Sequence, residues 1–127
     1  MEEIIKEQRE KHDAYDLVLG ILKDFPEEAE WDEMSFYESL FKNNNINTIL
    51  KLEFTEVEGK TYCEELAKVF DLMELSGLLI RRHERIRLDL KLIKSYFDLE
   101  IRPTFSEEDL KLITKLSENI QKELELI

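Results

Sequence analysis

The residues best suited to binding chemistry are four arginines that fall within seven positions: Arg81, Arg82, Arg85 and Arg87. A guanidinium group presents its N–H donors in a planar fork, which matches the paired oxygens of a carboxylate or a phosphate. The candidate partner-binding residues are Arg81, Arg82 and Arg85, which could bind a carboxylate, a phosphate or an acidic patch on a partner. The alternative is pairing with the protein's own surplus acids, in which each exposed pair contributes only about 0–1 kcal/mol.

A second group that could bind a partner is acidic and lies in the sequence DFPEEAEWDE, which contains no basic residue. Its candidate partner-binding residues are Glu27, Glu28, Glu30, Trp31, Asp32 and Glu33. An aromatic side chain ringed by charges is typical of interface hot spots, in which the ring anchors the partner and the charges steer its approach. The alternative is a solvated loop whose tryptophan folds back into the core.

Nucleophilic catalysis would need a serine or cysteine beside a histidine and an acid that orients it. Cys63 and His83 are the one plausible pair, and the sequence places them on separate elements. Glu64 and Glu65 directly follow the cysteine, and their charge opposes formation of a thiolate. We therefore expect Cys63 to be a small core residue and the protein not to be an enzyme.

Residues for a metal or cofactor site are also missing from the sequence. Two histidines and one cysteine cannot supply a zinc ligand set, and neither histidine has the glutamate three residues earlier that a helical di-iron site requires. There is no glycine-rich loop to hold a phosphate. We expect no cofactor and no metal, and we interpret His12, on the apolar side of the first helix, as a structural histidine.

The overall composition limits the classes of partner. The 127 residues include 30 acids against 18 lysines and arginines, a net charge of −12. This charge argues against nucleic-acid binding, which depends on cations that replace the counterions of the phosphates, and it favours a protein partner with a basic surface. No apolar run is long enough for a membrane span. One cysteine and no export signal fit a reducing, cytoplasmic location.

Helices are expected to position these residues, because few glycines and prolines are available for the turns of a many-stranded fold. Apolar residues three and four positions apart predict a helix over 2–23, a short helix capped by Asp32, and a final helix over 107–126 that begins at Ser106. A further helix is predicted from residue 60.

Two segments are ambiguous between helix and strand. Over 46–57 a strand would explain the alternating Leu50, Leu52 and Phe54, but a helical face matches a greater length, and we predict helix. Over 86–101 an alternating pattern covers only the first residues. The helical face covers about twice that length and consists of Ile86, Leu90, Ile93, Phe97 and Ile101.

We therefore predict a helix over about 87–101, with 81–85 as a turn between two helices. The expected fold class is all-α: a compact bundle of five or six helices that forms a single domain over 1–127.

Residues 70–101 (FDLMELSGLLIRRHERIRLDLKLIKSYFDLEI) resemble the centre of a group of small bacterial helical domains of unknown function. In that group a helix ending F-E-x-x-G-L-L-I-x-R is followed by a short turn and by a second helix, which opens near I-x-x-D-L and carries a late aromatic residue. The matching positions are Glu74, Gly77, Leu78, Ile80, Arg82, Ile86, Asp89, Leu90 and Phe97. The segment from His83 to Arg85 departs from the pattern, which has a glycine-containing turn there. The resemblance implies a helical fold and carries over no activity and no functional residue.

Two functions rank first. One is a non-enzymatic, acidic protein-interaction domain, such as a mobile-element or phage inhibitor, an antitoxin or an accessory subunit, which binds a basic surface of its partner. The other is a winged-helix transcriptional regulator. ELAKVFDLMELSGLLIRR resembles a recognition helix and first wing strand, RIRLDL would be the second strand, and the arginine-rich wing would contact the DNA backbone. Apolar stripes on the first and last helices also allow a homodimer.

Overall fold

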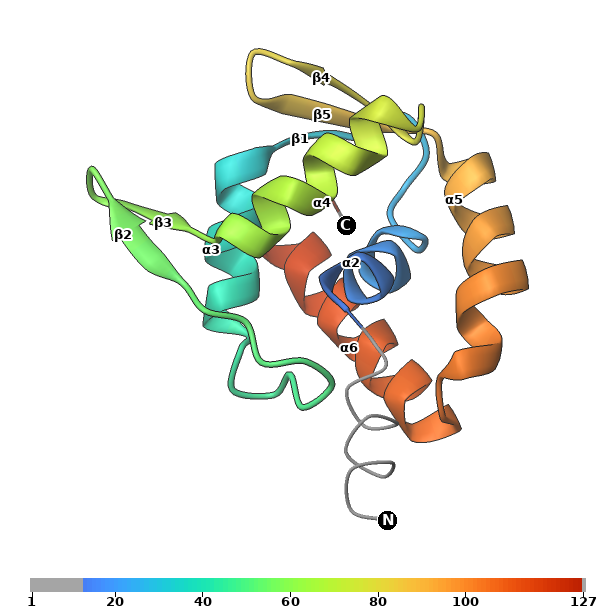
Figure 1. Ribbon diagram of the computed structural model, residues 1–127. Coiled ribbons are helices and arrows are strands. Elements are labelled where there is room, and N and C mark those ends of the chain that lie inside the picture. The colour runs from blue at the N-terminus through green and yellow to red at the C-terminus, as the bar shows by residue number, and fades with distance from the viewer. Residues whose placement is uncertain (1–12, 127) are drawn as a thin grey trace.

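The computed structural model describes residues 13–126 and combines helices with two antiparallel sheets (Figure 1). The predicted all-α bundle is therefore wrong, and the fold class is α+β. The helices are α2 (Ala14–Leu22), α3 (Glu33–Lys42), α4 (Glu64–Leu75), α5 (Leu90–Tyr96) and α6 (Glu107–Glu123). The strands are β1 (Glu30–Asp32), β2 (Thr55–Val57), β3 (Lys60–Tyr62), β4 (Leu79–Arg82) and β5 (Arg85–Leu88). A π-helical turn (Phe97–Ile101) and a 3-10 turn (Arg102–Thr104) follow α5.

The main sheet is built from strands that lie far apart in the sequence, in the order β1-β5-β4. The chain runs through α2, β1, α3 and α4 and then forms a β4–β5 hairpin that pairs back onto β1. A separate β2–β3 hairpin is inserted between α3 and α4 and projects from the body of the molecule (Figure 1). The two strands that the winged-helix hypothesis required are confirmed.

The helix predicted over 87–101 is wrong at its start. Residues predicted as a turn and as the beginning of that helix form the β4–β5 hairpin instead. The helix begins at Leu90, where the Asp89 carboxylate accepts a hydrogen bond from the backbone N–H of Leu92 at 3.2 Å. Ile86 fits both the strand pattern and the helix pattern. It is a buried residue of strand β5, and it also stands four positions before Leu90, which is the spacing of one helical face. Periodicity alone could not separate the two structures.

The helix predicted over 46–57 is also wrong. A loop leads into the β2–β3 hairpin, and the side chain of Asn47 organises it: the amide donates to the carbonyl of Leu50 at 2.9 Å and accepts from the N–H of Ile49 at 3.2 Å. The hairpin then turns at Glu58 and Gly59, whose φ angles are 52° and 78°. An asparagine that bonds its neighbouring backbone competes with helix formation.

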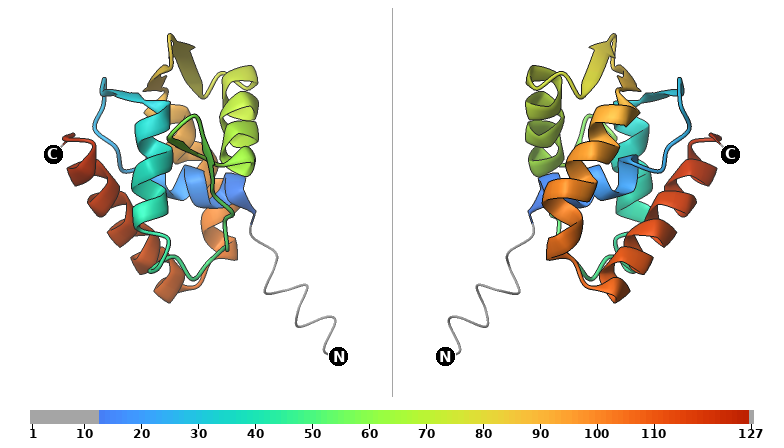
Figure 2. Two further views of the ribbon diagram at one scale, coloured as in Figure 1. Left: turned by 90° about the vertical axis from the view of Figure 1, so that its left-hand side faces the viewer. Right: turned by 90° about the vertical axis from the view of Figure 1, so that its right-hand side faces the viewer.

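Helix α2 lies in the middle of the molecule, with α4, α5 and α6 around it (Figures 1 and 2). Each of its residues from position 17 to 22 is buried, as expected for a helical stretch that is apolar on all sides. A Cβ at Gly20 would lie 3.0 Å from Cγ2 of Ile113 on α6, so the glycine allows the two helices to approach closely. Ser117 of α6 donates a hydrogen bond to the carbonyl of Ile21 at 2.6 Å.

Two predicted helix starts are confirmed. The carboxylate of Asp32 accepts from the N–H of Ser35 at 3.0 Å at the start of α3, and the hydroxyl of Ser106 accepts from the N–H of Asp109 at 3.1 Å at the start of α6. The helix predicted over 2–23 agrees with α2. Its first part, including His12, lies outside the described residues.

Candidate partner-binding face of the main sheet

The β4–β5 hairpin carries the four arginines and is closed by a two-residue turn, His83 and Glu84. Both residues have positive φ angles, 51° and 67°, as in the hairpin turns that follow the natural twist of antiparallel strands. The turn makes Arg82 and Arg85 directly opposite partners. Because successive side chains of a strand point to opposite faces, the hairpin divides the arginines between an inner and an outer side of the sheet.

The outer side of the sheet brings the two charged segments of the sequence together. Within β5, Ile86 is fully buried while Arg85 and Arg87 on either side of it are exposed. The pairing of β1 with β5 places Glu30 opposite Arg87 and Asp32 opposite Arg85. We call this surface the charged face; it consists of Glu30, Asp32, Ile80, Arg82, Arg85 and Arg87.

Within the described residues, the arginines of the charged face do not neutralise the protein's own acids. Among residues 13–126, Arg82, Arg85 and Arg87 form no ion pair. In that part of the chain their one hydrogen bond runs from Nη2 of Arg85 to the backbone carbonyl of Glu30, at 3.2 Å. These three guanidinium groups therefore keep most of their donors available to an external ligand.

Arg81 is different, because it lies on the inner side of β4. Its Nε lies 2.8 Å from a carboxylate oxygen of Glu33, and its Nη1 lies 2.8 Å from Asp71 and 3.7 Å from Glu74. The contact with Glu33 is an ion pair without a hydrogen bond, since the N–H does not point at the oxygen. Burial alone would lower the pKa of Arg81, but the hydrogen bond to Asp71 and the charges of the three acids raise it. Arg81 thus ties β4 to α3 and α4.

Glu33 belongs to the same internal network. The hydroxyl of Tyr37, one helical turn along α3, donates a hydrogen bond to the Glu33 carboxylate. Burial and this hydrogen bond raise the pKa of Tyr37 well above its ordinary value, so the hydroxyl remains a donor. Two of the predicted partner-binding residues, Glu33 and Arg81, are therefore engaged within the fold.

Trp31 lies in the core, as the alternative to an exposed anchor predicted. Its side chain is 2% exposed, and its ring centroid lies 5.5 Å from that of Phe25, 5.3 Å from Phe36 and 5.9 Å from Phe70. The indole N–H has no hydrogen-bond acceptor among the described residues. The ring supports the sheet from within, and it is not available to a partner at the surface.

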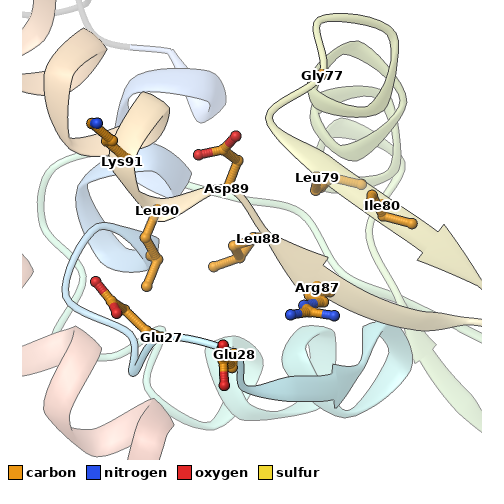
Figure 3. Close-up of a pocket in the computed structure, with 10 residues that line it drawn as sticks. All are labelled: Glu27, Glu28, Gly77, Leu79, Ile80, Arg87, Leu88, Asp89, Leu90 and Lys91. Carbon is orange, nitrogen blue, oxygen red and sulfur yellow. The ribbon is translucent and has the colours of Figure 1, made fainter.

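Two neighbouring cavities extend the charged face. The first, about 360 Å³, lies where the sheet meets the start of α5, with Glu27 and Glu28 on one side and Leu79 and Ile80 on the other (Figure 3). The second, about 300 Å³, lies over the hairpin. Its lining residues are Glu30, Ile80, Arg82, His83, Arg85 and Arg87. The cavities share Ile80 and Arg87, so together they border one continuous surface.

Most of the predicted partner-binding residues meet at this surface. They are Glu27, Glu28, Glu30, Asp32, Arg82 and Arg85. Ile80, Arg87 and Lys91 line the same surface but were not among the predicted site residues. The alternation of polar and apolar residues from Arg85 onward was the signal for Arg87. Nothing in the apolar sequence LLI indicated that Ile80 faces outward.

No group of three or more histidine, cysteine, aspartate or glutamate side chains in residues 13–126 could hold a metal ion. Cys63 is buried just before α4, and burial raises the pKa of its thiol, which opposes a thiolate. His83 is exposed at the tip of the hairpin.

Across residues 13–126 no helix has the length and apolar character needed to cross a membrane. Comparison of the chain with protein-family models, with curated proteins and with solved structures gave no match. The resemblance of residues 70–101 to small helical domains therefore stays a prediction. The function must be inferred from the charged face itself.

Proposed function

We propose that the protein is a non-enzymatic protein-interaction module and that its partner binds at the charged face. The observation that carries this proposal is the pair of exposed arginines directly opposite acids of β1, Arg85 and Arg87, with Arg82 beside them, none of which forms an ion pair within residues 13–126. An arginine that serves the fold is engaged as Arg81 is, with three carboxylates around it. We place the module in the cytoplasm, a location that the single free cysteine supports.

The charges around the face describe the partner. The net charge of −12 attracts a basic protein over a distance, and the exposed Glu27 and Glu28 offer carboxylates to its lysines and arginines. At contact, the three arginines need acceptors, which carboxylate side chains or backbone carbonyls supply through forked hydrogen bonds. The partner is thus a protein with a basic surface that also presents acceptors at the point of contact. An inhibitor or an accessory subunit would bind in this way.

Binding through exposed charges is expected to depend on salt. Affinity capture from a native lysate at low salt, with elution by a high-salt wash, supplies the candidate partner for a titration with purified proteins. We expect its affinity to fall about tenfold or more between low and high salt, because exposed charges are screened over about 10 Å at 0.1 M. The paired variant Glu27→Lys/Glu28→Lys should weaken binding by a similar factor.

The matched control for that variant is Glu107→Lys/Glu118→Lys. It makes the same change in net charge at exposed positions of α6, away from the charged face. We expect the control to retain most of the affinity, with only the small loss that the reduced net charge causes. An affinity that does not change with salt, or that falls equally in both variants, would count against the proposal.

A second function, binding of duplex DNA by a winged helix, is favoured by the order of the elements and by the arginines of the β4–β5 hairpin. The surface of α4, which would enter the major groove, opposes it. The exposed charged residues there are Glu64, Glu65, Lys68, Asp71 and Glu74. Four acids against one lysine repel the phosphates that flank the groove.

Duplex DNA binding can be measured by fluorescence anisotropy at low salt, where phosphate contacts are strongest. We expect no binding by the wild-type protein. Two results together would instead support the winged-helix regulator. The wild-type protein would bind DNA, and the paired variant Arg82→Ala/Arg85→Ala would lose DNA binding but still bind the protein partner.

A further inference from the structure

The outer side of α5 and of the π-helical turn after it carries an apolar stripe that is largely uncovered by the other described elements. Leu92 and Tyr96 of α5 and Leu99 of the turn are 48%, 43% and 75% exposed, and spacings of four and three place them near one side of the helix. The Tyr96 ring also contacts Tyr15 of α2 in a T-shaped arrangement, with 6.2 Å between the ring centroids. In the right-hand view of Figure 2, the ribbon of α5 lies in front of α2. The opposite side of the same helix is buried, through residues such as Ile93 and Phe97. Large apolar side chains that gather in one exposed patch are typical of interaction surfaces.

Charged residues flank the stripe in a regular order. Lys91 precedes Leu92 and Asp98 precedes Leu99, so two opposite charges stand seven positions, about two helical turns, apart on the same flank. Both are exposed. This arrangement corresponds to the flanking positions of a two-helix interface, whose charges decide which helix pairs with which and in what orientation.

We propose that the stripe is the interface of a homodimer, in which the α5 helices of two copies pack antiparallel. In that orientation Leu92 of each copy meets Leu99 of the other, and the two Tyr96 rings lie near the twofold axis. Lys91 of each copy then faces Asp98 of the other, so both ion pairs form at once. One surface that complements itself is what an interface between identical subunits requires.

The same charges favour the antiparallel over the parallel orientation. In a parallel pair, the flank that carries Lys91 and Asp98 would face the opposite flank of the other helix, so neither ion pair would form. Asp98 already accepts a hydrogen bond from Arg102 of its own chain at 2.9 Å. Both side chains of that pair are about half exposed, 47% and 57%, and a carboxylate has further acceptor sites for a second cation.

The interface is small, so the dimer is weak. Three apolar side chains over two to three helical turns fall at the low end of the areas that support stable association. We expect dissociation in the micromolar range or above. A dimer presents two charged faces, which would strengthen the binding of a partner that has two sites. The dimer does not depend on the proposed function, because its formation is measured without any partner.

Sedimentation velocity of the full-length protein, from micromolar to millimolar concentration, tests the inference. Leu99→Glu should abolish the dimer. Because this side chain is exposed, we expect the variant to stay folded, and circular dichroism checks its fold. Lys91→Asp and Asp98→Lys should each raise the dissociation constant about tenfold or more, since each creates two repulsive contacts. The swap Lys91→Asp/Asp98→Lys should restore dimerisation to within about threefold of wild type, because both pairs then form again with reversed signs.

Cross-linking supplies an independent readout of the orientation. Ser95 lies beside the twofold axis of the proposed antiparallel pair, so Ser95→Cys should form a disulfide between two copies on mild oxidation. The exposed Ser76, directly after α4, is the control, and Ser76→Cys should not form one. Cys63 is buried and does not interfere. Either of two results would overturn the inference. The wild-type protein would stay monomeric at millimolar concentration, or the Lys91→Asp/Asp98→Lys variant would dimerise more weakly than either single variant.

Discussion

Replacing Ile86 by alanine is expected to lower the free energy of unfolding by about 2–5 kcal/mol, the usual cost of removing most of a buried aliphatic side chain. Ile86 is 0% exposed and is the central residue of the main sheet, paired with Trp31 on one side and Arg81 on the other. Removing most of its side chain leaves a cavity beside Trp31 and the aromatic rings that pack around it. Urea denaturation followed by tryptophan fluorescence measures the change.

The matched control is Ile80→Ala, one strand away on the opposite face. Ile80 is 55% exposed, so the same substitution should change the free energy of unfolding by about 0.5 kcal/mol or less. Equal losses at the two positions would contradict the division of the hairpin into inner and outer residues. They would also remove the argument that Arg85 and Arg87 share an exposed face.

Replacing Arg81 by methionine is expected to cost about 1–3 kcal/mol of stability, whereas Arg82→Met should cost about 0.5 kcal/mol or less. Removing one partner of a fully buried ion pair costs about 3–5 kcal/mol because the other charge is left uncompensated. The side chains of Arg81 and Glu33 keep 22% and 15% of their surface exposed, so solvent screening reduces the expected loss. Arg82 has no ion pair among the described residues, and its loss removes little.

A double-mutant cycle separates the ion pair from the packing of the arginine stem. If Glu33 is the uncompensated charge, Arg81→Met/Glu33→Gln should recover part of the loss caused by Arg81→Met alone. If the stability losses of the two single variants simply add in the double variant, the pair of Arg81 and Glu33 contributes nothing to stability. The distinction between Arg81 and the outer arginines would then lack energetic support.

The sequence was a sound guide to most elements for which only one period fitted, although the helix predicted from residue 60 begins at Glu64, because Lys60–Tyr62 form strand β3. The apolar α2, the start of α3 at Asp32 and the start of α6 at Ser106 follow from local patterns and capping. Over 86–101 both periods fitted, because Ile86 is buried whether it belongs to a strand or to a helix. The pairing of β5 with β1, more than fifty positions earlier, decided between them, and a pairing so distant in the sequence leaves no local signal.

The candidate site shows the same limit. Charge clustering alone identified both halves of the charged face, the acids before α3 and the arginines after α4. Their meeting on one surface depends on strand register, and a register shifted by one residue would have turned Arg85 and Arg87 inward. The same register explains why Trp31 and Arg81 lie inside. Arg81 is of the same type as the arginines of the charged face, and only the direction in which its side chain points distinguishes it.

The most direct test of the charged face is the affinity of the captured partner for Arg85→Glu/Arg87→Glu, compared with Lys111→Glu/Lys115→Glu, by isothermal titration calorimetry at low salt. Both variants make the same change in net charge, the second at exposed positions of α6. We predict that the arginine variant loses about a hundredfold or more in affinity, since each arginine contributes charge-assisted hydrogen bonds at contact, while the lysine variant stays within about threefold of wild type. Equal affinities of the two variants would contradict the assignment of the charged face as the partner-binding site.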